Sequence, residues 1–263
     1  MHSFCEAVHI RYNLGMFRLL CITAHPDDEA GNFGGTLLTY RARGVETSVI
    51  CLTPGQAASN RGDAKSDQEL AEVRKREFAA SCEILRVSQP VILDYPDGQL
   101  YRQELNRVVY ELTLHVRRFR PDVMLTFGAE GGLTGHPDHS MAGVFATLAF
   151  HWAGRANRYS DQLHDGLTAH PTQKLYHATA TFSLPNRPPT AFAPHTAVIE
   201  IDDYLETKIA AFKAHKSQAA LWPLFEENVR KRGRRELFHL AASVKNGAAE
   251  PETDLFDGIS LTP

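Results

Sequence analysis

Two short clusters of imidazole and carboxylate side chains mark this sequence, about a hundred residues apart. The first is Ala24-His25-Pro26-Asp27-Asp28-Glu29, and the second is Gly135-His136-Pro137-Asp138-His139. Each cluster follows a short apolar run with the composition of a buried strand. Open α/β sheets bind their ligands outside the carboxyl ends of the strands. We therefore expect the two clusters to meet at one edge of a sheet, where they can converge on one metal ion.

The residue types in the clusters suit a hydrolytic zinc site. Such a site has three protein ligands from His, Asp or Glu and keeps one position open for water. His25 and either Asp27 or Asp28 would come from the first cluster, and His136 or His139 from the second. Zinc lowers the pKa of bound water from about 15.7 to near 7, and a carboxylate that does not bind the metal can take the proton. Adjacent aspartates suit this division, because neighbouring side chains on an extended backbone point in different directions.

Each cluster taken alone also has a structural interpretation. A lone His-Pro-Asp is usually a turn, and Asp28 and Glu29 would stabilise the start of a following helix. Asp138 could likewise cap the helix that follows the second cluster. The occurrence of both clusters at equivalent strand ends favours the metal site over these alternatives.

The elements that must position the clusters alternate along the chain as strand and helix. Apolar runs predict strands over residues 17–23, 46–53, 91–94 and 121–127. Helices are expected over residues 34–44, 67–85, 105–119 and 138–152. This alternation predicts an α/β fold, a Rossmann-like three-layer α/β/α arrangement with a mostly parallel central sheet and right-handed crossovers. Beyond it, strands are expected over 174–182 and 196–201, and a helix over 203–220.

The length of 263 residues suits one large domain with a substantial core. We expect residues 17–245 to form this single catalytic domain. Residues 1–16 are expected to be a disordered or extended segment without the apolar region of a signal peptide, and Met16 is a possible alternative start. Residues 246–263 have the composition of a weakly ordered tail.

Composition excludes several classes of protein. The net charge of −3, with both signs scattered along the chain, gives no footprint for nucleic acid and no polybasic membrane anchor. No apolar run approaches the roughly 18 residues of a membrane span, so no integral membrane segment is expected. The four cysteines lack the spacing of a disulfide framework or a cysteine zinc site. A reducing compartment, the cytoplasm, is therefore expected.

The two clusters, together with Gly34-Gly35-Thr36, resemble the signature of the LmbE/PIG-L family. The resemblance extends over residues 17–218. Members of this family are zinc-dependent de-N-acetylases and amidases that act on N-acetylglucosaminyl conjugates. The resemblance implies a small-molecule sugar conjugate as the partner, and a homo-oligomer is possible.

The resemblance also implies a role for each residue of the clusters. His25, Asp28 and His139 would bind one zinc ion per chain, and such a ligand set also accepts ferrous iron. Asp27 would be the general base that activates the water. His136 would stabilise the oxyanion or protonate the leaving amine.

Four further residues are candidates for substrate contact: Arg74, Asp97, Thr134 and His215. Arg74 resembles a family arginine near the sugar or its phosphate-bearing aglycone, and its alternative is a solvated helix face. Asp97 follows a strand on the active edge, where it could accept sugar hydroxyls or be a plain turn residue. Thr134 stands where some relatives have a tyrosine, on a much shorter arm. His215 belongs to a His-x-x-Gln element that could line the pocket, support it, or end a solvated helix.

The main functional hypothesis is removal of an N-acetyl group from an N-acetylglucosamine-containing small conjugate. An alternative with the same chemistry is an amidase that cleaves glucosaminyl-thiol S-conjugates. Alternatives from another class are a non-catalytic sugar-binding module and a nucleotide-binding module that uses Gly34-Gly35. The first strand lacks the Gly-x-Gly-x-x-Gly element of a phosphate cradle, and retention of Asp27 beside the ligands favours catalysis over binding.

Overall fold

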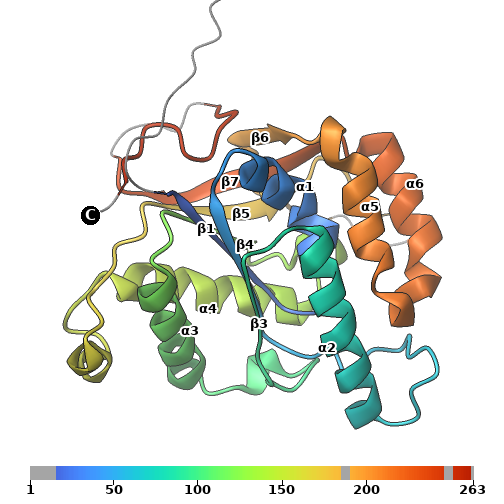
Figure 1. Ribbon diagram of the computed structural model, residues 1–263, viewed down its shortest axis with the longest axis horizontal. Coiled ribbons are helices and arrows are strands. Elements are labelled where there is room, and N and C mark those ends of the chain that lie inside the picture. Colours follow the sequence, from blue (N-terminus) through green and yellow to red (C-terminus); the bar gives the residue numbers. More distant parts are fainter. Residues whose placement is uncertain (1–15, 185–189, 246–250, 262–263) are drawn as a thin grey trace, which may run out of the picture.

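A central sheet organises the molecule (Figure 1). The computed structural model describes residues 16–184, 190–245 and 251–261. Within these residues the sheet has seven strands in the order β3-β2-β1-β4-β5-β7-β6. Strands β1 to β5 pair in parallel, whereas β7 is antiparallel to both β5 and β6. Their bounds are Arg18–Thr23, Glu46–Cys51, Gln89–Ile92, Val123–Phe127, Lys174–Thr179, Ala197–Glu200 and Arg235–Ser243 for β1 to β7.

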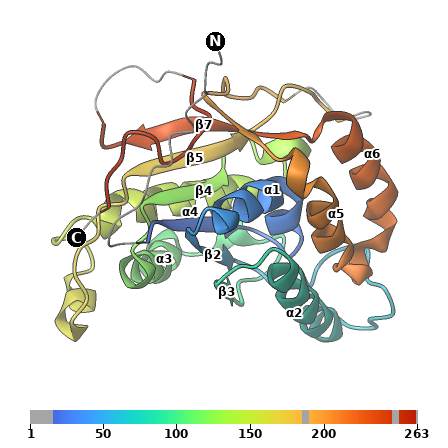
Figure 2. The same cartoon turned by 45° about the horizontal axis from the view of Figure 1, so that its top comes forward.

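Helices cover both faces of this sheet. Their bounds are Asp28–Ala42, Asp67–Ile84, Leu105–Phe119, Pro137–Ala153, Leu205–Lys213 and Trp222–Arg232 for α1 to α6. Helices α3 and α4 pack together on one face, and α1, α2, α5 and α6 form the layer on the other (Figures 1 and 2). The predicted three-layer α/β/α fold with a mostly parallel sheet is confirmed. Among the described helices, none is long and apolar enough to cross a membrane.

Strands β1 and β4 lie side by side at the centre of the sheet, with Leu19 opposite Val123 and Cys21 opposite Leu125. The chain leaves β1 into α1 on one face and leaves β4 into α4 on the other. Crevices of this kind, where the strand order reverses, are the usual ligand sites of open α/β sheets. The loops that carry the two clusters therefore open at the same point of the carboxyl edge.

Strands β1 and β4 lie in the core, and only Arg18 of the two is partly exposed. Leu19, Leu20 and Ile22 of β1 and every residue of β4 are buried. Helix α1 begins at Asp28, six residues earlier than the expected Gly34. Gly34 and Gly35 lie inside this helix, and a Cβ on Gly35 would stand 2.4 Å from Ile201 Cδ1. The two glycines thus allow close helix packing rather than forming a phosphate-binding turn, which removes the basis of the nucleotide-binding alternative.

The C-terminal region differs from expectation. Instead of one helix over 203–220, α5 ends at Lys213 and α6 starts at Trp222, with short 3₁₀ turns on either side of α5. Strand β7 was not expected at all. Its inward-facing Glu236 is only 5% exposed, so the strand lacks the apolar alternation that would have revealed it. The Glu236 carboxylate accepts hydrogen bonds from the backbone of Gly35 and Thr36 and from Lys208 Nζ.

The expectation of a weakly ordered tail over 246–263 is wrong for the described stretch 251–261. Val198 N–H donates to Glu252 O, which ties this stretch to β6. Leu255 is fully buried and Phe256 nearly so. The stretch is mostly polar, and this composition concealed the part that Leu255 and Phe256 have in the core. Phe256 packs on Phe17 and Tyr40. The expected N-terminal segment, apart from Met16, lies outside the described residues.

Candidate metal centre

Three side chains from the two clusters converge at the carboxyl ends of β1 and β4. His25 Nδ1 lies 3.3 Å from His139 Nε2 and 3.6 Å from Asp28 Oδ2. His139 Nε2 lies 3.1 Å from Asp28 Oδ1. All three side chains are buried, with residue exposures of 5–8%. Two imidazole nitrogens and one carboxylate thus face a common point between α1 and α4.

These residues fit a tetrahedral zinc ion. With metal–ligand bonds of about 2.0–2.1 Å, tetrahedral geometry separates the ligand atoms by about 3.3 Å. The contact between His25 Nδ1 and His139 Nε2 has this length, and the Asp28 carboxylate approaches the two imidazoles at 3.6 and 3.1 Å through different oxygens. The donor set of two neutral imidazoles and one carboxylate, with a position left for water, is that of hydrolytic zinc sites.

The ligand atoms are held in place by the surrounding backbone. Asp28 Oδ2 accepts hydrogen bonds from the N–H groups of Ala24 and His25, at 3.2 and 2.9 Å. His139 Nδ1 lies 3.2 Å from Gly131 O, and since a carbonyl only accepts, Nδ1 carries the proton. The lone pair of His139 Nε2 is therefore free for a metal, and the ring also stacks on Phe127.

Carboxylates surround the other side of the His25 ring. His25 Nε2 lies 3.1 Å from Asp97 Oδ1 and 3.4 Å from Asp138 Oδ2, but neither contact has hydrogen-bond geometry. Burial alone would lower the pKa of His25, yet Asp138, Asp28 and Asp97 hold it well above its usual range. This excess of buried negative charge is the environment that a divalent cation would neutralise.

The pKa values of the adjacent carboxyl groups of Asp27 and Asp28 shift in opposite directions. Burial would raise the pKa of Asp28, but His139 and His25 beside it hold that pKa well below its usual range. Burial raises the pKa of Asp27 to about 6, against the opposing charge of Arg74. The two adjacent aspartates thus have different environments, one suited to holding a cation and one suited to exchanging a proton.

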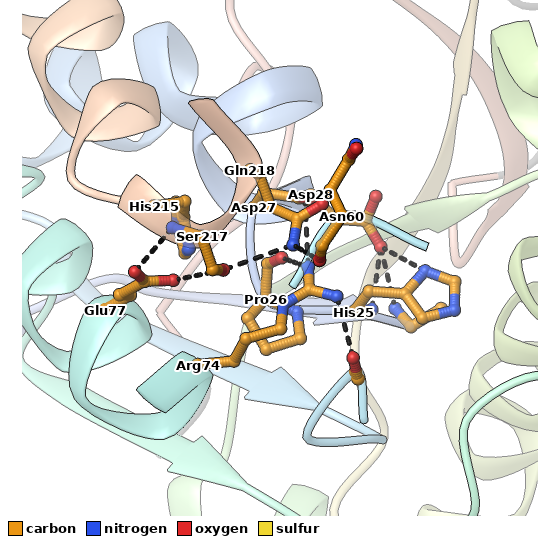
Figure 3. Close-up of polar contacts among 12 residues, drawn as sticks. His25, Pro26, Asp27, Asp28, Asn60, Arg74, Glu77, His215, Ser217 and Gln218 are labelled. Atoms are coloured by element: carbon orange, nitrogen blue, oxygen red, sulfur yellow. Dashed lines mark hydrogen bonds and ion pairs between the residues drawn. The ribbon is translucent and has the colours of Figure 1, made fainter. Parts of the chain in front are cut away.

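Asp27 stands at the start of α1 with a backbone that is rare for a residue other than glycine. Its φ is 112° and its ψ is −24°. Arg74 lies against it: one guanidinium nitrogen donates to Asp27 Oδ2 at 3.0 Å and to Pro26 O (Figure 3). The other terminal nitrogen of Arg74 donates to Gly55 O at 3.0 Å.

His136 lies beside the three ligands, and its ring meets the His25 ring edge-on with centroids 4.7 Å apart. One nitrogen each from His25, His136 and His139 fall within 4.8 Å of one another. Asp138 N–H donates to His136 Nδ1 at 3.1 Å, so the proton of the neutral ring is on Nε2. Burial, then the neighbouring His25 and His139, lower the pKa of His136. It is therefore a neutral N–H donor at the mouth of the site.

The four candidates for substrate contact occupy different places. Asp97 is within reach of His25, and its second oxygen accepts from Ala57 N–H at 2.9 Å. Arg74 is 3% exposed and is occupied by the contacts to Pro26, Asp27 and Gly55 described above. Thr134 is exposed and lies in the 3₁₀ turn 132–134, within the glycine-rich loop between β4 and α4. His215 is fully buried on Glu29, with Nε2 2.7 Å from its Oε1. The structure thus places Arg74 and His215 behind Asp27 rather than on an open pocket wall.

Two buried acids have a larger part in the site than their sequence positions indicated. Asp138 was expected only as a helix cap, but its carboxylate accepts from the N–H groups of Gly98 and Leu100 and faces His25. Glu29 was expected only to favour the helix start, but it is fully buried and accepts from Asp27 N–H. The available signal was the run of three acids, Asp27, Asp28 and Glu29, directly after a buried strand. Asp138 gave no comparable signal, because it is the single acid of the second cluster.

Comparisons with known proteins place the chain among sugar deacetylases and related amidases by sequence and by fold. A family model described as PIG-L, GlcNAc-PI de-N-acetylase, matches residues 20–150, which include both clusters. A diacetylchitobiose deacetylase from Thermococcus kodakarensis is 32% identical over 216 residues, 81% of this chain and 75% of that protein. A mycothiol S-conjugate amidase from Streptomyces coelicolor is 30% identical over 201 residues, 70% of this chain and 66% of that protein. The solved structure of N,N'-diacetylchitobiose deacetylase from Pyrococcus horikoshii, complexed with its inhibitor MPG, matches with a TM-score of 0.70 at 25% identity, covering 85% of this chain and 83% of that one.

Proposed function

The chain belongs to the PIG-L family, and from this premise we propose that it is a metal-dependent hydrolase that removes the N-acetyl group from a small conjugate containing N-acetylglucosamine. The observation that carries the proposal is the convergence of His25, Asp28 and His139 beside a non-ligand carboxylate, Asp27. Relatives that deacetylate chitobiose or cleave a thiol conjugate support the same substrate class.

Zinc is the proposed metal, and the side chains of His25, His139 and Asp28 would hold it. When bound, it supplies a water molecule whose pKa is near 7 and a positive charge beside the scissile carbonyl. The His139 Nδ1–H contact to Gly131 O and the backbone donors to Asp28 fix the ligand atoms before the metal arrives. Ferrous iron would suit the same donors.

Asp27 is the proposed general base. It takes a proton from the attacking water as the new C–O bond forms at the acetyl carbon. The same carboxyl group then returns a proton to the nitrogen as the C–N bond breaks, which yields acetate and the free amine. Arg74 favours the ionised carboxylate, because its guanidinium donates to Asp27 Oδ2 at 3.0 Å.

His136 is proposed to stabilise the oxyanion of the tetrahedral intermediate. Its Nδ1 accepts from Asp138 N–H, so the neutral ring carries its proton on Nε2 and can act as a hydrogen-bond donor. This arrangement favours the oxyanion role over protonation of the leaving amine, since a neutral imidazole N–H is a poor acid. Substrate contact by Asp97 and Thr134, one metal per chain, homo-oligomer formation and a cytoplasmic location stay predictions.

The amidase that cleaves glucosaminyl-thiol S-conjugates is the second candidate. The specific observation in its favour is the similarity to the amidase from Streptomyces coelicolor. Both reactions hydrolyse an amide on the glucosamine nitrogen, so both use the same residues. They differ in the acyl group, which is an acetyl group in the first and a larger acyl group with a substituted sulfur in the second.

The test combines metal analysis of the purified protein with an assay for free amine. N-acetylglucosaminyl conjugates and thiol S-conjugates are offered separately, before and after chelation and after zinc is restored. About one metal ion per chain, with chelator-sensitive amine release from the N-acetyl substrate, supports the deacetylase. Release only from the thiol conjugate supports the amidase. A protein that binds no metal and cannot be reconstituted contradicts both.

A further inference from the structure

The unusual backbone of Asp27 needs support, because a positive φ strains any residue other than glycine and persists only where its surroundings fix it. The Asp27 side chain makes no capping hydrogen bond to the first turn of α1. Arg74 holds the carbonyl before Asp27 and its carboxylate. The N–H of Asp27 has a separate partner, Glu29 Oε2 at 2.9 Å.

Glu29 is the centre of a buried network that links three elements. Its Oε1 accepts from Ser81 Oγ of α2 at 2.6 Å and from His215 Nε2, after α5, at 2.7 Å. Glu29, Ser81 and His215 all have 0% exposure. A carboxylate is an acceptor only, so His215 Nε2 carries the proton that points to Glu29. His215 Nδ1 has no hydrogen-bond partner among the described residues.

Neighbours of His215 fix where it stands. Ser217 donates to the Glu77 carboxylate on α2 through its N–H and through its Oγ, both at 2.7 Å. Gln218 Nε2 donates to Asn60 O in the loop after β2, at 2.9 Å (Figure 3). The segment between α5 and α6 is therefore held against α2 and against the loop after β2, and this position brings His215 to Glu29.

We infer that Glu29 and His215 are positioning residues that hold the backbone N–H of Asp27, and through it the direction in which the Asp27 carboxylate points. His215 orients Glu29, Glu29 fixes the positive φ of Asp27, and Arg74 locks the carboxylate from the opposite side. Neither residue touches the substrate, because both are fully enclosed. The inference rests on the proposed function insofar as Asp27 is the base of the reaction.

The test compares His215→Leu with His215→Gln. Leucine removes the donor, whereas the glutamine amide can place an N–H where Nε2 stood. In His215→Leu we expect kcat for amine release to fall about 10- to 100-fold, with KM and bound metal unchanged. His215→Gln is expected to recover most of that loss. In the same variants, exchange of the Asp27 amide hydrogen is expected to be fast in His215→Leu and slow again in His215→Gln.

His170→Leu is the matched control. His170 is likewise buried at 1% exposure, has one contact through Nε2, to Pro121 O at 2.7 Å, and has an unpartnered Nδ1. It lies at the amino end of β4, on the opposite edge of the sheet from the site. Its loss should lower the melting temperature without changing kcat or Asp27 exchange.

Three results would overturn the inference. Wild-type kcat and slow Asp27 exchange in His215→Leu would show that the pair positions nothing. An equal loss of kcat in His170→Leu would show a general effect of stability. Failure of His215→Gln to recover either readout would show that the donor at Nε2 is not what matters. If the wild-type protein releases no amine from any substrate, the proposed function fails, while amide exchange still tests the positioning of Asp27 by itself.

Discussion

At the scale of single residues, the division of work between Asp27 and Asp28 follows from the hydrogen bonds each carboxylate receives. Asp28 Oδ2 is fixed by two backbone N–H groups, which leaves Oδ1 aimed at His139. The Asp27 carboxylate instead receives the Arg74 guanidinium. The first arrangement is typical of a metal ligand with a supporting shell, and the second of a base whose charge must be maintained.

We expect Asp27→Asn to retain its metal while kcat falls about 10²- to 10⁴-fold, since an amide cannot take the proton. Asp28→Asn is the matched variant one residue away, and it should lose metal affinity instead. Metal content by elemental analysis and kcat by amine release are measured on both. Loss of metal in Asp27→Asn with retention in Asp28→Asn would reverse the two assignments.

At the scale of elements, the second cluster depends on close contact between α4 and the end of β4. A Cβ on Gly143 would stand 2.3 Å from Phe127 O, a backbone atom that cannot turn aside. Gly131 lies in the loop between β4 and α4 and has a φ of 81°. Its carbonyl oxygen faces His139 Nδ1. The position of His139 is therefore set by glycines that let the helix approach the strand.

Gly143→Ala is expected to destabilise the fold by about 1–3 kcal/mol through overpacking and to weaken metal binding, because α4 must move away from β4. Gly31→Ala makes the same change inside α1, where the nearest atom to the new Cβ is a Phe212 side-chain carbon at 3.5 Å. This control should be neutral or stabilising by up to about 1 kcal/mol. Chemical denaturation and metal titration of both variants check the contrast. Equal behaviour of the two would rule out the close contact as the cause.

Elements with a local signal were predictable from sequence, and those without one were not. Helix α3 has the expected bounds, and α2 differs by one residue, because their apolar positions repeat with a helical period. Strand β3 starts two residues earlier than expected, at Gln89-Pro90, since an edge strand tolerates proline and polar side chains. Strand β7 was missed because the inward Glu236 finds its partners in α1 and α5, far away in sequence.

The candidate site shows the same limit. The motifs located both clusters and the shared sheet edge, because strand ends and residue types are local properties. The contact of His215 with Glu29 joins residues 186 apart, and the burial of Arg74 depends on how α2 packs. Neither can be inferred without the fold.

At the scale of the whole molecule, residues 251–261 are joined to the sheet by a buried ion pair. Lys174, at the start of β5, is 1% exposed and pairs with Glu252 at 2.6 Å. Tyr176 also donates to the Glu252 carboxylate. This pair lies at the opposite end of β5 from the metal centre, so it contributes to the fold and not to the reaction.

Glu252→Gln is therefore expected to cost about 3–5 kcal/mol of unfolding free energy, because it leaves the Lys174 ammonium buried without a counter-charge. Lys174→Met combined with Glu252→Gln should recover much of that loss. Urea denaturation of the single and double variants measures the difference, and kcat below the transition should equal that of wild type. A double variant no more stable than Glu252→Gln would show that the unpaired Lys174 ammonium is not the cause of the lost stability.

The place of β7 between β5 and β6 has a consequence for synthesis. Every proposed metal ligand and Asp27 precede residue 140, so a growing chain carries the chemistry long before it is finished. Until residues 235–243 leave the ribosome, β5 has a bare edge, β6 has no neighbour, and α1 lacks the Glu236 carboxylate on Gly35 and Thr36. Sheet completion by the final strand is a long-range closure, which is slow and leaves that edge open to pairing with other chains. Among the described strands β7 is the last along the chain, so the contacts of Glu236 that hold the middle of α1 form only after both clusters have been synthesised.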